Sequence, residues 1–168
     1  AAIRASKERR TKADPNYKGV ERRRSRKPTP VSLQSDYEKG HRDFSNLFLS
    51  QLDLRKQVFA GARFAKATLR KTNLLGADLS NTHWSQANLN QATLKNAKLA
   101  GAYLGCANLE YADLRGANLT KANFESANLQ GANLCGADLT GASITEAQLA
   151  VARTIWSTIQ VNGRRSLL

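Results

Sequence analysis

The sequence predicts a solenoid, a chain wound into repeating coils, and two observations support this prediction. A large apolar residue recurs at every fifth position from Phe44 to Leu149, 22 times in one register. Two residues before most of these stands a small residue, which is alanine without a break from Ala102 to Ala152. A period of five matches neither the 3.6-residue turn of an α-helix nor the two-residue alternation of a flat strand. The repeat therefore decides the architecture.

The residue between the small and the large one is often Asn or Asp, which gives Ala-Asn-Leu at 87–89 and 107–109 and Ala-Asp-Leu at 77–79 and 112–114. These motifs resemble the pentapeptide repeat family, whose consensus is Ala-(Asp/Asn)-Leu-X-X. The resemblance covers about residues 42–152. It implies an all-β fold, a right-handed quadrilateral parallel β-helix in which four pentapeptides close one square coil, and hence about five and a half coils.

The central apolar residues support four faces when they are sorted at a spacing of 20. One column then holds most of the central aromatic residues, which predicts a stacked aromatic column inside the coils: Phe44, Phe64, Trp84 and Phe124. The inward positions need one small residue and one that fills the centre of a narrow coil. The glycine that often takes the fifth place suits a tight corner.

The chain divides into three predicted segments. Residues 1–41 form a basic, low-complexity N-terminal extension, which we expect to be disordered on its own. Residues 42–152 form the β-helix, with an irregular first coil because Leu47, Leu52 and Gln57 replace the small residue. Residues 153–168 form a C-terminal cap and tail. We expect three apolar residues of that segment to cover the last coil, because a bare coil end exposes unpaired backbone: Ile155, Trp156 and Ile159.

Positive charge is concentrated at the N-terminal side of the chain. Residues 1–42 hold 13 Lys or Arg against 5 Asp or Glu, whereas residues 72–152 hold 4 against 6. The basic tail comprises Arg9, Arg10, Arg22, Arg23, Arg24, Arg26 and Lys27. A second group, the basic collar, falls at outward positions of the first coils: Arg55, Lys56, Arg63, Lys66, Arg70 and Lys71. The collar suits docking against an acidic surface, while aromatic residues interleaved for base stacking are missing.

The sequence offers no catalytic constellation, and we expect neither an enzyme nor a bound cofactor or metal. His41 and His83 have no partners at metal-ligand spacing. Cys106 and Cys135 fall at outward positions in different columns, so free thiols are expected in place of a disulfide. A filled rod also lacks the concavity that an active site needs.

The main functional hypothesis is a non-catalytic protein-interaction or scaffold subunit, a rigid rod anchored by its basic tail within a larger assembly. The alternative is a nucleic-acid-associated protein, ribonucleoprotein or DNA-bound, that uses the basic arm. A third possibility is attachment to an anionic membrane surface. The resemblance also brings in DNA mimicry by quinolone-resistance members, but that role requires an acidic rod and is disfavoured by charge. It further suggests a homodimer through the C-terminal end.

Localisation is inferred from the N-terminal residues. The opening Ala-Ala-Ile-Arg-Ala-Ser-Lys-Glu-Arg-Arg is basic and resembles the flank of an organellar transit peptide. Together with the frequency of the family in photosynthetic lineages, this favours a plastid protein, stromal or thylakoid-associated. A bacterial cytoplasmic protein with a basic arm is the alternative. The absence of methionine leaves processing and truncation equally open, and no stretch approaches the ~20 apolar residues of a membrane span.

Overall fold

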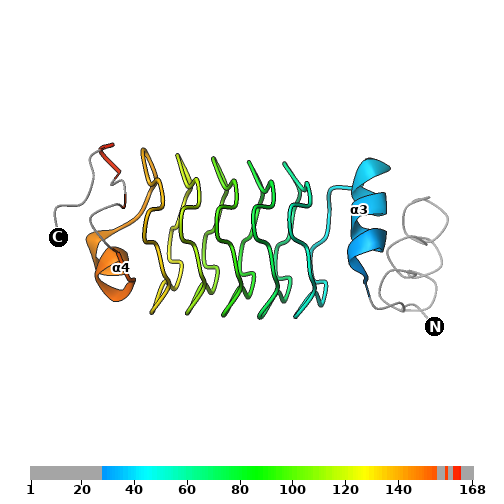
Figure 1. Ribbon diagram of the computed structural model, residues 1–168, viewed down its shortest axis with the longest axis horizontal. Helices are drawn as coiled ribbons and strands as arrows, with labels where there is room; N and C mark the ends of the chain where they lie inside the picture. The colour runs from blue at the N-terminus through cyan, green and yellow to red at the C-terminus, as the bar shows by residue number, and fades with distance from the viewer. Residues whose placement is uncertain (1–27, 155–157, 159–160, 164–168) are drawn as a thin grey trace, which may run out of the picture.

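The chain forms a rod of stacked coils with a short helix across each end (Figure 1). The computed structural model describes residues 28–154, 158 and 161–163. Helix α3 spans Pro30–Glu38 and helix α4 spans Glu146–Val151. Between them the coils pair through isolated parallel bridges, each joining a residue to the one 20 positions later, from Asp43↔Arg63 to Asn133↔Arg153.

Four such ladders run along the rod, and they begin in the first coil, residues 43–62, at Asp43, Phe48, Asp53 and Val58. Each coil therefore has four sides, one for each pentapeptide. The prediction of a solenoid with a 20-residue coil is confirmed, whereas its handedness and its coil count stay predictions.

The interior of the rod contains the two residue types that the repeat supplies. The large residues from Phe44 to Leu139 and the alanines two positions before them are almost completely buried. Phe44 stacks on Phe64 with ring centroids 5.3 Å apart, and Phe64 stacks on Trp84 at 4.5 Å. Leu104 separates this stack from Phe124 in the same column. The N-terminal coils thus have an aromatic core and the later coils a mainly leucine core.

The corners explain the glycines of the repeat. At each corner the chain makes a β-turn, as where the Ala62 N–H donates to the Phe59 carbonyl at 3.0 Å. The third residue of this turn is Gly61, with a φ of 69°. Positive φ at the third residue is the type II pattern, which glycine adopts without strain. Non-glycine residues adopt it at other corners, Tyr111 with a φ of 54° among them.

The Asn or Asp of the consensus has a structural role that the side-chain contacts reveal. Asn88 Oδ1 accepts the backbone N–H of Asn90 at 3.1 Å, and Asn118 Oδ1 accepts that of Thr120 at the same distance. This turn, in which a side-chain oxygen binds the backbone two residues on, favours Asn and Asp over other polar residues. The outward-facing Asn or Asp of the consensus therefore stabilises the backbone turn at the corner.

Helix α3 corrects the expectation that residues 1–41 are only a low-complexity extension. Thr29 and Ser32 form a reciprocal capping box around Pro30, which begins the helix. Leu33 is buried under the helix. The Tyr37 ring meets Phe59 edge to face at 5.6 Å, and its hydroxyl donates to the Ala60 carbonyl at 3.0 Å. The helix thereby closes part of the first coil.

Helix α4 corrects the prediction that regular pentapeptides continue to residue 152. Residues 146–151 are helical, and Ile144 and Leu149 are only partly buried, although both stay in register. Had the coil continued, the backbone N–H of residue 148 would reach the Ala127 carbonyl, as Asn128 N reaches Ala107 O at 2.9 Å. Here the side-chain Nε2 of Gln148 donates to Ala127 O at 3.0 Å instead.

The C-terminal end of the rod receives further contacts from beyond α4. The Thr158 hydroxyl donates to Leu134 O at 3.0 Å, and the Val161 carbonyl accepts from Gly141 N at 2.9 Å. The predicted cap residues Ile155, Trp156 and Ile159 lie outside the described residues, so their role stays a prediction.

Candidate interaction surface

All six residues of the basic collar are exposed on the first two coils. Arg55 and Lys56 belong to the first coil, and the others to the second coil, residues 63–82. Each occupies an outward position because it precedes the large buried residue or follows it by one or two positions. The coil stack therefore places cations on more than one side of its N-terminal part.

Arg55 differs from the rest of the collar because it is neutralised locally. Its Nη2 lies 2.7 Å from Asp53 Oδ2 and its Nε 2.8 Å from Asp53 Oδ1, a two-pronged ion pair. The hydrogen bonds from Arg55 lower the pKa of the Asp53 carboxyl, and those to Asp53 raise the pKa of the guanidinium. The other five collar residues form no ion pair with any described residue: Lys56, Arg63, Lys66, Arg70 and Lys71.

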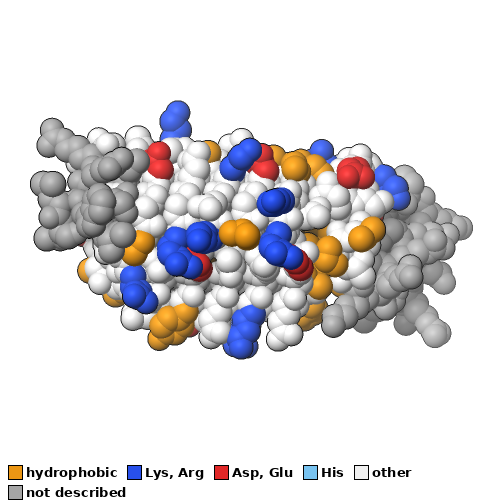
Figure 2. Space-filling view, in the orientation of Figure 1, with side chains coloured by type: hydrophobic (Ala, Val, Ile, Leu, Met, Phe, Trp, Pro, Cys, Tyr) orange, Lys and Arg blue, Asp and Glu red, His pale blue; other side chains and the backbone are white. Residues whose placement is uncertain are grey.

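The later coils hold their charges differently. Arg115 pairs with Asp113 at 2.7 Å, and Lys98 lies 3.6 Å from Asp78. Figure 2 shows cationic side chains along the visible face of the rod, several of them beside an acidic one. Only two cations of the later coils before α4, Lys95 and Lys121, form no ion pair with a described residue, against five in the collar, so uncompensated positive charge is densest at the collar.

The first coil also exposes apolar side chains that the sequence analysis did not single out. Phe48 is 76% exposed and Val58 is 44% exposed. Both precede the large buried residue, at the position where the consensus has Asn or Asp. An apolar residue at that polar position was the signal available in the sequence.

The remaining predicted interaction residues fall outside the described part of the chain. This applies to the whole basic tail, Arg9, Arg10, Arg22, Arg23, Arg24, Arg26 and Lys27. The tail stays a prediction.

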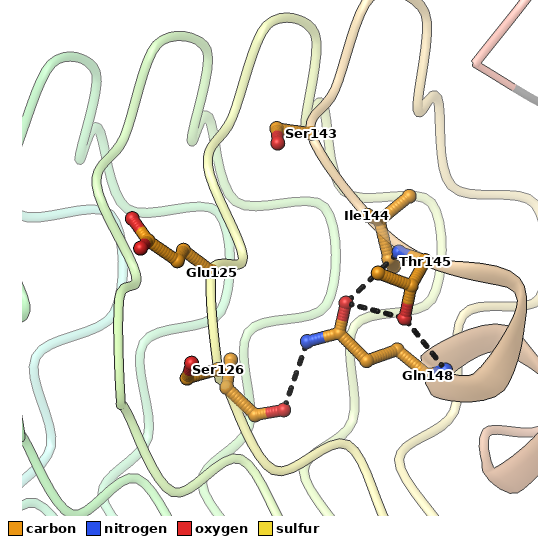
Figure 3. A pocket seen from close by; sticks show the side chains of 7 residues that line it. Glu125, Ser126, Ser143, Ile144, Thr145 and Gln148 are labelled. Carbon is orange, nitrogen blue, oxygen red and sulfur yellow. Dashed lines mark hydrogen bonds between the residues drawn. The ribbon is translucent and has the colours of Figure 1, made fainter.

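A hollow of about 530 Å³ opens at the other end of the rod, where α4 leaves the coil (Figure 3). Gln148 crosses its base and also donates to Phe124 O at 2.7 Å. The lining residues are Glu125, Ser126, Ala127, Ser143, Ile144, Thr145 and Gln148. Glu125 is the one titratable group among them, so the hollow contains no acid–base pair for catalysis.

The residues considered for metal or thiol chemistry lie apart in the described structure. No group of three His, Cys, Asp or Glu side chains gathers within the described residues. His41 lies near α3, where its Nδ1 is 3.0 Å from Asp36 O, whereas His83 lies beside Tyr103 on the coils. Cys106 and Cys135 are both free, as predicted.

Comparison with known proteins agrees with the repeat. The family model described as pentapeptide repeats matches residues 43–76, 72–105, 102–141 and 117–150. The chain is 30% identical to a pentapeptide repeat protein from Nostoc, over 76% of this chain and 96% of that one, with a TM-score of 0.46. It is 27% identical to one from the thylakoid lumen of Arabidopsis thaliana, over 74% and 80% of the two chains, with a TM-score of 0.42.

A third structure is QnrB1, a plasmid-mediated fluoroquinolone resistance protein, at 20% identity over 61% of each chain and a TM-score of 0.43. No curated protein sequence matches the chain.

The coil ladders and the exposed cations define a solenoid repeat protein that presents charge on a rod. Since the family model spans residues 43–150, well over half of the sequence, the chain belongs to the pentapeptide repeat family. None of the described helices has the length and apolar character needed to cross a membrane.

Proposed function

We propose that this chain is a non-catalytic binding subunit whose N-terminal coils dock against an acidic surface of a protein partner in a larger assembly. The observation that carries the proposal is the set of five collar cations that form no ion pair with a described residue. Cations left uncompensated on a folded surface attract an oppositely charged partner and direct its approach.

The coil stack suits this role because it holds the collar in a fixed arrangement. Every coil after the first binds its predecessor through backbone hydrogen bonds, for example Thr68 N to Leu47 O at 2.9 Å and Asn73 N to Leu52 O at 2.9 Å. A surface preorganised in this way loses little conformational entropy on binding. The basic tail would add a second, less specific attachment, and the plastid localisation stays part of this proposal.

The test compares two charge reversals in the full chain. Arg70→Glu with Lys71→Glu alters the collar, and Lys95→Glu with Lys121→Glu is the matched control, because these four cations form no ion pair with a described residue. Each variant is used as bait in an extract of the cells that produce the protein, with and without nuclease.

We expect the collar variant to lose its protein partners while the control variant and nuclease-treated samples retain them. Recovery that disappears with nuclease would instead identify a nucleic-acid-associated protein. Recovery unaffected by either reversal would contradict a role for the collar.

A further inference from the structure

The first coil differs from the later coils because most of its outer backbone edge forms no hydrogen bond with a described residue. In the second coil, the N–H groups of Thr68, Asn73 and Asp78 each donate to the preceding coil at 2.9 Å. The corresponding first-coil N–H groups, those of Phe48, Asp53 and Val58, make no hydrogen bond with any described residue, and their carbonyls accept none. These three residues lie on different sides of the coil, so each side by itself presents such donors and acceptors as a template for another strand.

Helix α3 stands across this end of the rod (Figure 1) but satisfies only part of the edge. Its one described hydrogen bond to the coil backbone joins the Tyr37 hydroxyl to Ala60 O. In the later coils, a carbonyl at that place accepts a backbone N–H, as Ala65 O does from Asn46 at 2.9 Å. The helix therefore satisfies one carbonyl on the side that contains Val58, and the backbone N–H and C=O groups of Phe48 and Asp53 pair with no described residue.

The side chains along this edge are unusual for the rod. Phe48 projects with 76% of its surface exposed. The positions above it in the same ladder are all polar: Thr68, Asn88, Asn108 and Asn128. Proteins usually protect a free edge with charged residues or proline. An aromatic side chain at the edge instead provides apolar contact area for whatever pairs there.

The charge beside the edge indicates the chemistry of the occupant. Phe48 is bridged to Thr68, and Arg70 and Lys71 follow Thr68 on the second coil without an ion pair to a described residue. The nearby Asp53 is already neutralised by Arg55. An acidic segment fits these cations, whereas a basic one is repelled by them.

We infer that a short, extended acidic segment of a protein partner adds to the first coil as a further strand. Its backbone pairs with the N–H and C=O groups of Phe48 on one side of the coil, an apolar side chain packs on the Phe48 ring, and its carboxylates face Arg70 and Lys71. This inference rests on the proposed function and specifies how the collar end recognises its partner.

The test uses two end-blocked hexapeptides of equal charge with the full chain. One alternates glutamate and valine and can pair as a strand. The other alternates glutamate and proline and lacks the alternate N–H groups that pairing needs. We expect the valine peptide to slow hydrogen exchange at the amide of Phe48, measured by NMR, and to bind at least about tenfold more tightly than the proline peptide.

A side-chain comparison completes the test. Phe48→Ala should weaken binding of the valine peptide about tenfold, whereas Tyr111→Ala, which removes a 57%-exposed aromatic residue of the later coils, should leave it unchanged. Equal binding of the two peptides, or binding without protection of the Phe48 amide, would overturn strand addition and leave the electrostatic proposal intact. The Arg70→Glu and Lys71→Glu variant tests that proposal separately.

Two further outcomes would assign the edge to another occupant. Protection of the Phe48 and Asp53 amides that grows with protein concentration, without peptide, would show pairing with a second copy of the chain. Protection already complete in the dilute protein would show that the chain covers its own edge. Either result would overturn the inference of an acidic partner segment.

Discussion

The two ends of the rod terminate the same repeat in different ways. At the C-terminal end, the side-chain amide of Gln148 donates to Ala127 O, where a backbone N–H would donate in a continuing coil. At the N-terminal end, Tyr37 donates to one carbonyl, and the backbone of Phe48 and Asp53 forms no hydrogen bond with a described residue. In the interior of the rod, each coil satisfies the backbone N–H and C=O groups of its neighbours. At each end these groups need partners from outside the repeat.

The two halves also differ in their interiors and in their charge. The N-terminal coils contain the stacked rings of Phe44, Phe64 and Trp84, while leucine dominates the later coils. The same N-terminal coils display five collar cations that form no ion pair with a described residue. An aromatic core, a charged surface and an outer edge without hydrogen bonds to described residues distinguish the half that we propose binds a partner from the later coils.

The largest expected effect is on the free energy of unfolding, which should depend on the aromatic residues of the core and not on the exposed Phe48 at the edge. Trp84→Ala removes a fully buried ring that stacks on Phe64, and should lower the free energy of unfolding by about 3–5 kcal/mol. Phe48→Ala, at a position that is 76% exposed, should change it by less than about 0.5 kcal/mol. Urea denaturation of both variants measures the difference. Similar losses in the two would contradict the assignment of Phe48 to the surface.

A second prediction concerns the two buried threonines that replace alanine in this half. Thr82 Oγ1 accepts the Trp84 Nε1–H at 2.7 Å and donates to Leu79 O. Thr82→Val leaves that buried N–H without an acceptor and should lower the unfolding free energy by about 1–3 kcal/mol. Thr72→Val is the matched control, because Leu49 O loses the Thr72 hydroxyl but still accepts Leu52 N. A cost for Thr72→Val equal to that for Thr82→Val would argue against this reading of the network.

The third prediction compares the two end closures directly. Gln148→Leu removes donors to Phe124 O and Ala127 O and the capping contact with Thr145, and should destabilise the C-terminal end by about 1–3 kcal/mol. Tyr37→Phe removes one hydrogen bond and should destabilise the N-terminal end by about 0.5–1.5 kcal/mol.

Hydrogen exchange locates each of these effects. Gln148→Leu should speed exchange at Gly131 and Leu134, whose amides bind residues 151 and 153. Tyr37→Phe should leave those amides unchanged. Faster exchange along the whole rod in either variant would show that the ends are not separate structural units.

The repeating part of the fold was predictable because one period determines it. The spacing from Phe44 to Leu139 identified the buried residues, and the fifth-place glycines identified the corners. The end helices were not predicted, although each carries a local signal. Thr145 and Gln148 form a capping box, which Leu149 and Ala152 obscure by staying in register. Pro30 follows the capping residue Thr29 in a segment without apolar periodicity.

The candidate site was predictable in its charges but not in its edge. Outward positions followed from the register, so the exposure of Arg63 or Arg70 could be read from the sequence. Whether the Phe48 backbone finds a partner among the described residues depends on where the coil stack begins and on what α3 covers. Neither follows from a periodic pattern, because the pattern does not specify which residues pair with the outer backbone edge of the first coil.

The smallest expected effect compares the ion pairs Asp53–Arg55 and Asp113–Arg115, which repeat one arrangement in the two halves. The hydrogen bond from Arg115 lowers the pKa of the Asp113 carboxyl, with burial opposing it, and Arg55 acts likewise on Asp53. A carboxyl whose pKa is lower in the folded than in the unfolded protein stabilises the fold above the unfolded pKa of about 3.9. That stabilisation disappears as the pH falls through the folded pKa.

Asp113→Asn keeps a side-chain oxygen for the Arg115 N–H, as Asn118 does for Thr120, and removes the charge. We expect a loss of stability at pH 7 smaller than any described above and a flatter fall of stability between about pH 5 and pH 2. Asp53→Asn should do less, because the Asp53 side chain is 52% exposed against 26% for Asp113 and water weakens its ion pair. Unfolding free energies measured across this pH range test the order. A larger effect at Asp53 would show that the stability of the first coil depends on the Asp53–Arg55 ion pair. Arg55 would then stabilise the first coil as well as belong to a surface for a partner.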